Sequence, residues 1–193
     1  MSHTQMFTNP LINADFPDPS VIYVSGDGYY AYATHDEFSP TINNIQLSKS
    51  DDLVNWSEPI GALIEPPVWA KTCNKFWAPQ VVKVADQYRL YYAAESDTKD
   101  GMCLALAISD KPYNFKDIGK PLAQVPGSTY KMIDPCFFYD VKSGKSFFKE
   151  FKGDRIVFRG SKKHLYYWHN PFFHHPALLH FTVKVKIGDC LGL

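Results

Sequence analysis

The sequence lacks any long apolar run. None of its 193 residues lie in a stretch of about 18 apolar residues, and the first ten, MSHTQMFTNP, lack the basic segment and apolar core of a secretory signal. We therefore expect a cytoplasmic protein with no membrane partner. The four cysteines include no CxxC pair, which argues against a zinc knuckle or a disulfide framework and predicts mostly buried free thiols.

Net charge is also absent, but only by cancellation. Residues 1–141 hold 17 acidic and 10 basic side chains, whereas residues 142–193 hold 3 and 10, together with five of the seven histidines. The scattered lysines come without a recognition module, so we expect no nucleic-acid partner. The histidines lack cysteine or acidic partners at ligand spacing, so we expect no metal site. We divide the chain into a unit at 1–146 and a divergent basic tail, rich in histidine and aromatics, at 147–193.

An internal repeat runs through the first part of the chain. Three segments each hold a proline, an apolar strand, a polar turn and a second strand rich in Tyr or Phe: DPSVIYVSGDGYYAYATH, APQVVKVADQYRLYYAAE and DPCFFYDVKSGKSFF. Their prolines, Pro19, Pro79 and Pro135, are 60 and 56 residues apart. A second half-repeat places Ser50 opposite Ser109, 59 residues later. The repeating unit therefore holds about four short strands.

The repeat predicts the fold class. A four-stranded unit at this spacing is typical of a propeller blade, which buries its faces only against neighbouring blades. A β-sandwich also has many short strands and is the alternative, although two coinciding offsets favour the propeller. We predict an all-β, propeller-like chain of about three four-stranded blades, the third completed or covered by residues 147–193.

Four motifs carry a family resemblance: NPLINADFPDPSVI, SDDLVNW, FWAPQVV and MIDPCFFYD. Over residues 8–145 the chain resembles glycoside hydrolase family 43, whose five-bladed propellers hydrolyse arabinan, arabinofuranosyl and xylosyl linkages with inversion. The resemblance implies a carbohydrate substrate such as arabinan, arabinoxylan or their oligosaccharides, no required cofactor, and an optional calcium ion on the propeller axis. It also implies an incomplete propeller, whose open edges we expect either the tail or a second copy of the chain, in a homo-oligomer, to cover.

The resemblance also implies site residues. In that family the aspartate of the first D-P dipeptide, here Asp18, is the general base, and the aspartate of the third-blade I-D-P, here Asp134, orients the acid and tunes its pKa. Trp77 matches an aromatic floor of the sugar pocket, and His35 and Phe38 are candidates for its rim. Each also has a structural interpretation: Asp before Pro often caps a turn, and Trp77 and His35 suit a core.

The chemistry explains why such residues are far apart in the sequence. Blades converge on one axis, so residues at the inner start of each blade meet there. Prolines on both sides of Asp18 restrict its backbone, which keeps the carboxylate in one orientation. An inverting hydrolase uses a carboxylate base and a carboxylic acid about 6.5–9.5 Å apart.

The family's general acid is missing from the pattern. It is a glutamate in a fourth-blade E-G-P motif, and after Glu150 the sequence has no glutamate. Two hypotheses therefore stay open. The chain is either an inverting hydrolase whose acid is supplied in an unexpected way, or a non-hydrolytic remnant that binds carbohydrate or is purely structural.

Overall fold

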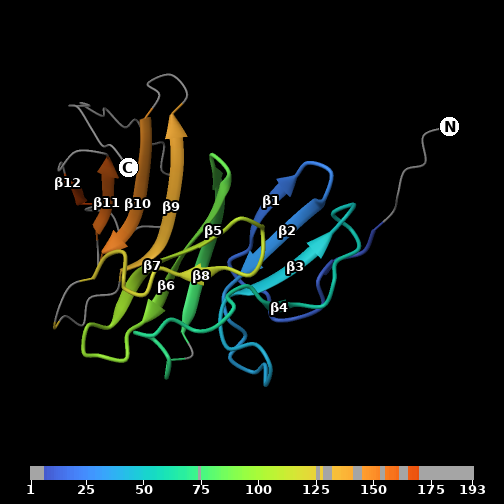
Figure 1. The fold of residues 1–193 in the computed structure, drawn as a ribbon, viewed down its shortest axis with the longest axis horizontal. Helices are drawn as coiled ribbons and strands as arrows, with labels where there is room; N and C mark the ends of the chain where they lie inside the picture. The colour runs from blue at the N-terminus through green and yellow to red at the C-terminus, as the bar shows by residue number, and fades with distance from the viewer. Residues whose placement is uncertain are drawn as a thin grey trace.

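The structure, a computed structural model, describes residues 7–73, 75–124, 127, 132–140, 145–152, 155–160 and 165–169. This part of the chain forms three antiparallel four-stranded sheets that follow one another along the sequence (Figure 1). The first sheet holds β1 (Ser20–Val24), β2 (Gly28–Ala33), β3 (Gln46–Ser50) and β4 (Ile60–Gly61). The second holds β5 (Phe76–Val84), β6 (Gln87–Glu95), β7 (Met102–Ser109) and β8 (Lys116–Asp117). The third holds β9 (Met132–Asp140), β10 (Lys145–Lys152), β11 (Arg155–Gly160) and β12 (Leu165–His169).

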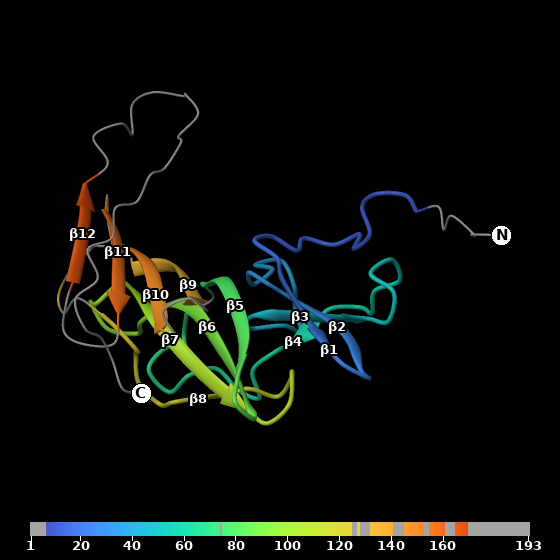
Figure 2. The same cartoon turned by 90° about the horizontal axis from the view of Figure 1, so that it is seen from above.

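Each sheet is a propeller blade. The strand order within a sheet follows the chain, and the first strands contact one another in turn, β1 with β5 and β5 with β9. The blades succeed one another from the N-terminal blade to β12 at the far end (Figure 2). The predicted all-β propeller of about three four-stranded blades is thereby confirmed. Strands β10 to β12 fall mainly in the segment assigned to the tail, whereas the boundary at 146 stays a prediction. In the described residues, no helix could span a membrane.

The turn between β1 and β2 shows how the sequence specifies a hairpin. The residues SGDG supply two glycines at positive φ, Gly26 at 78° and Gly28 at 103°. A Cβ at Gly28 would lie 2.7 Å from the carbonyl oxygen of Ser50 on β3, so only glycine fits there. Strand β1 then alternates between more and less exposed side chains, as expected for a strand with one face toward the core.

The first two blades share one hydrophobic core. Its buried members are aromatic and aliphatic side chains of both sheets, separated by alanines that let the strands approach: Tyr30, Tyr32, Ile45, Leu47, Ala62, Leu63, Ala70, Phe76, Val81, Tyr88, Leu90, Tyr92, Ala94, Ala105, Ala107 and Phe115. At the outer side, Leu63 and Phe115 form a parallel bridge, and the Phe115 ring packs edge-on against Tyr32 with centroids 6.0 Å apart. The two blades are thus held together by both apolar packing and backbone hydrogen bonds.

A half-buried carboxylate connects the outermost strand of the second blade to other parts of that blade. Asp117 on β8 accepts hydrogen bonds from the Tyr92 hydroxyl (2.7 Å), the Trp69 indole (3.1 Å) and the Gly119 amide (2.7 Å). Burial raises the pKa of Asp117, and the three donors only partly counteract it. Burial, together with the neighbouring Asp117 charge, also raises the pKa of Tyr92 well above its ordinary value.

Candidate active site

The three X-Pro dipeptides of the repeat share an unusual backbone. Asp18, Ala78 and Asp134 each precede a proline, and each has a positive φ, 53°, 44° and 54° respectively. Residues other than glycine adopt this left-handed conformation rarely, and they do so mostly at turns and functional sites. Aspartate tolerates it better than alanine. The repeat therefore imposes one special conformation at the start of every inner strand.

Beta-bulges accompany these dipeptides. The pairing of β5 with β6 shifts register between Trp77 and Gln80, and the pairing of β9 with β10 shifts opposite Asp134. Proline cannot donate a hydrogen bond to a neighbouring strand, so it is tolerated on these edge strands where the ladder is already interrupted. A bulge redirects the side chain at its position, and bulges are common beside active sites. In the first blade the dipeptide lies just before β1.

The Asp18 carboxylate is connected to the second blade through one threonine. Thr34, which follows β2, donates its hydroxyl to Asp18 Oδ2 at 2.8 Å and accepts the backbone amide of Ala78 at 2.9 Å. The Asp18 side chain is exposed to solvent. The base predicted from the sequence therefore lies on the surface, where the first and second blades meet.

Asp134 lies on β9, the strand that packs beside β5. Gln80, two residues after Ala78, is bonded to the backbone of Phe137 on both sides of its amide: Oε1 accepts the Phe137 N–H at 2.5 Å, and Nε2 donates to its carbonyl at 3.2 Å. The Phe137 ring stacks on Tyr91 with centroids 5.8 Å apart. These contacts hold the bulges of the second and third blades along neighbouring strands. The Asp134 side chain is exposed, like that of Asp18.

The predicted sugar-binding residues occupy different environments. Trp77 is half-buried on β5, next to Ala78. His35 is buried: its Nε2 lies 2.7 Å from the Ile42 carbonyl, and its amide donates to the Phe76 carbonyl at 2.8 Å. Phe38, in the loop between β2 and β3, is 90% exposed. His35 thus has the structural environment weighed from the sequence, Phe38 is accessible to a ligand, and the substrate contacts of all three stay predictions.

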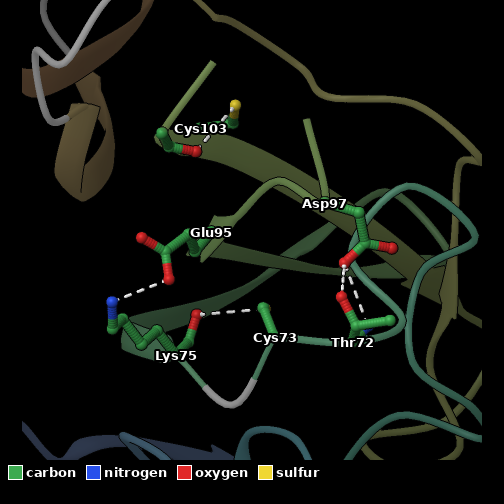
Figure 3. Close-up of polar contacts among 7 residues, drawn as sticks. Thr72, Cys73, Lys75, Glu95, Asp97 and Cys103 are labelled. Atoms are coloured by element: carbon green, nitrogen blue, oxygen red, sulfur yellow. Dashed lines mark hydrogen bonds and ion pairs between the residues drawn. The ribbon is translucent and has the colours of Figure 1, made fainter. Parts of the chain in front are cut away.

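The corner of the second blade next to Phe76 is polar (Figure 3). Lys75 and Glu95 form an ion pair of 2.7 Å between Nζ and Oε2, which raises the pKa of Lys75. Asp97 accepts the Thr72 hydroxyl at 2.6 Å and the amides of Thr72 and Lys71 at 2.9 and 2.8 Å. These bonds, the hydroxyl first, hold the pKa of Asp97 below its usual range. The charged groups at this corner are therefore occupied by protein partners.

Two cysteines near this corner are thiols of low reactivity. Cys103 is buried, and desolvation raises its pKa to about 11. Burial also raises the pKa of Cys73, which is half-buried. With Cys136, they are free cysteines. Because the thiolate is the reactive and metal-binding form, neither Cys73 nor Cys103 is suited to catalysis.

Metal binding has no support in the described residues. There, no group of three His, Cys, Asp or Glu side chains could hold an ion. The histidines of the tail lie outside the residues whose side chains are described. The calcium ion that the resemblance implies as optional therefore stays a prediction.

Sequence reasoning missed three polar side chains of the site. Thr34 connects Asp18 to the second blade, Gln80 connects the second blade to the third, and Gln46 holds the backbone around Thr34. Gln46 is 1% exposed and donates from Nε2 to the carbonyls of Thr34 (2.6 Å) and Asp15 (2.8 Å). For Gln80 the available signal was a polar residue on the mainly apolar strand β5, which marks a group that needs partners.

Comparison with known proteins agrees with the fold and the motifs. The model of the family described as glycosyl hydrolases family 43 matches residues 7–169. The extracellular endo-alpha-(1->5)-L-arabinanase of Thermotoga petrophila is 31% identical over 155 residues, covering 64% of this chain and 31% of that protein. The beta-xylosidase of Formosa agariphila is 27% identical over 151 residues, covering 73% of this chain and 23% of that protein.

A solved structure extends the likeness to three dimensions. The crystal structure of a thermostable family-43 glycoside hydrolase superposes with a TM-score of 0.65 at 27% identity, over 82% of this chain and 52% of that one. The chain therefore spans about half the length of this structural relative and a third or less of the two curated relatives.

Proposed function

Because the chain belongs to the glycosyl hydrolases family 43, we propose that it hydrolyses arabinofuranosyl linkages of arabinan, or related xylosyl linkages, with inversion at the anomeric carbon. One observation carries the proposal. Asp18 and Asp134 occupy the same left-handed position before a proline in two blades whose inner strands both pack on β5. The arabinanase and xylosidase names of the relatives support the substrate class.

Asp18 acts in this proposal as the general base. Its exposed carboxylate takes a proton from a water molecule while the water oxygen attacks the anomeric carbon. The glycosidic C–O bond breaks in the same step, and the leaving oxygen takes a proton from a general acid that lies outside the motifs identified in the sequence. Asp134, at the equivalent position of the third blade, acts in this proposal through its negative charge, which favours the protonated state of the catalytic acid. Trp77 offers a half-buried aromatic surface on which a sugar ring packs through its apolar face.

A second candidate function is carbohydrate binding without hydrolysis. The observation that favours it is that the three described blades hold the proposed base, the proposed modulator and an aromatic surface, whereas none of their described residues is assigned as the proton donor. Without a proton donor for the leaving oxygen, the site would keep its affinity for sugar but would lose most of its turnover.

The Asp18→Asn variant separates the two functions. Asparagine also tolerates a positive φ, so the backbone of the dipeptide is preserved while the basic oxygen is lost. We expect release of reducing sugar from debranched arabinan, and of p-nitrophenol from the α-L-arabinofuranoside or β-D-xyloside, to fall at least about 100-fold. Binding of arabino-oligosaccharides, measured by calorimetry, should change little.

The matched control is Asp51→Asn, an exposed aspartate just after β3, beside the β1–β2 turn. This variant should keep wild-type turnover. Hydrolysis that survives in Asp18→Asn would show that Asp18 is not the general base. A folded wild type that binds arabino-oligosaccharides without cleaving them would favour the second function. Inversion is tested by proton NMR of the first anomer released, and the predicted homo-oligomer by analytical ultracentrifugation.

A further inference from the structure

The Thr34 hydroxyl lies between the proposed base and the next blade. It donates to Asp18 Oδ2 at 2.8 Å and accepts the Ala78 amide at 2.9 Å. We infer that Thr34 is a positioning residue, which holds the Asp18 carboxylate in a set orientation relative to the second blade. This inference rests on the proposed function, in which Asp18 takes the proton from water.

The direction of the two hydrogen bonds decides what Thr34 can do. A backbone amide can only donate, so the Ala78 N–H occupies a lone pair of Thr34 Oγ1. The single hydroxyl proton is then directed to Asp18 Oδ2. Among the described residues, the hydrogen-bond partner of this carboxylate is Thr34, which contacts Oδ2. Oδ1 is therefore available to receive a proton from water. Oδ2 is hydrogen-bonded to Thr34, and Oδ1 is accessible to water, as a general base requires.

The backbone of Thr34 is itself held from two sides. Its amide donates to the Pro17 carbonyl at 2.9 Å, and its carbonyl accepts the buried Gln46 amide at 2.6 Å. The same Gln46 Nε2 donates to the Asp15 carbonyl at 2.8 Å, on the segment that leads into Asp18. Thr34 and the segment that leads into Asp18 are therefore both hydrogen-bonded to one buried side chain. A displacement of about 1 Å in a reacting group can cost about 100-fold in rate, so this support is relevant to catalysis.

The second blade offers a matched control. Thr72 also donates its hydroxyl to an aspartate, Asp97 Oδ1 at 2.6 Å (Figure 3), and it too lies outside the strands. Asp97 has no proposed part in the reaction. Thr72→Val thus removes the same type of hydrogen bond without touching Asp18.

The experiment compares wild type with Thr34→Val, Thr34→Ser and Thr72→Val. Valine has the shape of threonine without the hydroxyl, and serine keeps the hydroxyl. On debranched arabinan we expect Thr34→Val to lower kcat about 10- to 100-fold and to change KM less than about twofold. Thr34→Ser should restore most of kcat, and Thr72→Val should match wild type.

A second readout does not depend on turnover. In protein labelled at the aspartate side-chain carboxyl carbon, the Asp18 resonance, assigned by its loss in Asp18→Asn, should shift in Thr34→Val and stay unchanged in Thr34→Ser and Thr72→Val. An unshifted resonance in folded Thr34→Val overturns the positioning role, whether or not kcat falls. A shifted resonance with wild-type kcat also overturns it. If wild type shows no hydrolysis, the proposed function fails, and the resonance alone decides whether Thr34 orients Asp18.

Discussion

At the residue scale, strained backbone conformations occur directly before the prolines of the repeat. Six residues other than glycine have a positive φ, in the part of the chain that the structure describes: Asp18, Leu53, Ala78, Ala85, Asn114 and Asp134. Three of these precede the inner-strand prolines, and two of the three are the proposed carboxylates. Such conformations persist only where surrounding contacts hold them, as Thr34 does at Asp18 and Ala78.

Ala85 shows the same strain without a functional reason. It lies in the turn between β5 and β6, is exposed, and has a φ of 53°. Glycine removes the steric cost of the left-handed conformation, which is about 1–2 kcal/mol, and adds a smaller entropic cost in the unfolded chain of about 0.4–1 kcal/mol. We predict that Ala85→Gly raises the free energy of unfolding by about 0.5–1 kcal/mol, as measured by urea denaturation.

The control is Ala14→Gly, at an exposed alanine whose φ is not positive. It should be neutral or slightly destabilising, because there glycine only increases the entropy of the unfolded chain. A loss of stability in Ala85→Gly as large as in Ala14→Gly would contradict the role assigned to strain at this turn.

At the element scale, short outer strands depend on side-chain anchors. Strand β8 spans only Lys116–Asp117 and is paired to β7 by two residue pairs. Its position is reinforced by Asp117, which accepts hydrogen bonds from the Tyr92 hydroxyl of β6 and from the Trp69 indole in the segment before β5. Strand β8 is thereby connected to elements that it does not pair with.

The raised pKa of Asp117 predicts a pH dependence of stability. Because the folded pKa lies above the ordinary value of 3.8, folding favours the protonated form. The contribution of Asp117 to the free energy of unfolding is therefore greatest below the unfolded pKa and declines as pH rises through the folded pKa. In Asp117→Asn, Oδ1 can accept the same two N–H donors and Nδ2 can donate to the Tyr92 oxygen, so the variant keeps the contacts without the charge.

We predict that the stability of wild type relative to Asp117→Asn falls as the pH rises from below 3.8 through the raised pKa of Asp117, and then levels off. Urea denaturation of both proteins across this range measures the difference, in which the titration of all other carboxyl groups cancels. A difference that rises with pH would show that the three hydrogen bonds outweigh burial.

At the scale of the whole molecule, the blades are joined in two ways. The first and second blades share a continuous apolar core and the bridge between Leu63 and Phe115. The second and third blades are joined in the described part by β5 and β6 against β9, through the two Gln80 hydrogen bonds and the stacking of Tyr91 on Phe137. Gln80 thus supplies two polar contacts between the described parts of the second and third blades.

Gln80→Ala should loosen the third blade selectively. Removing the amide leaves both the N–H and the carbonyl of Phe137 without this partner, at a cost of about 1–3 kcal/mol. We predict faster hydrogen exchange of the Phe137 amide and its β9 neighbours, with little change in β2 of the first blade. The control is Gln87→Ala, at the opposite end of the second blade. If hydrogen exchange became equally faster in both variants, or in β2 and β9 alike, the role of Gln80 in joining the third blade to the second would be contradicted.

The sequence alone determined the architecture because local, periodic patterns of residues specify the strands and their repeat. Alternating apolar residues, turn glycines and a proline every 56 to 60 residues specify strands and their repeat without reference to distant contacts. The same regularity places Asp18 and Asp134 at equivalent positions of their blades. Their proposed roles came from the family resemblance carried by the surrounding motifs.

Only the tertiary structure decided how those positions are connected. The bonds from Thr34 to Asp18 and Ala78 span 16 and 44 residues, and those from Gln80 to Phe137 span 57. No local pattern specifies which polar side chain meets which backbone group across a blade boundary, because that depends on how the blades pack. The left-handed conformation of Ala78 likewise follows from the bulge and the packing of β5, not from its own preference. The sequence therefore determined the blades and their repeated aspartates, and packing determined the contacts that orient them.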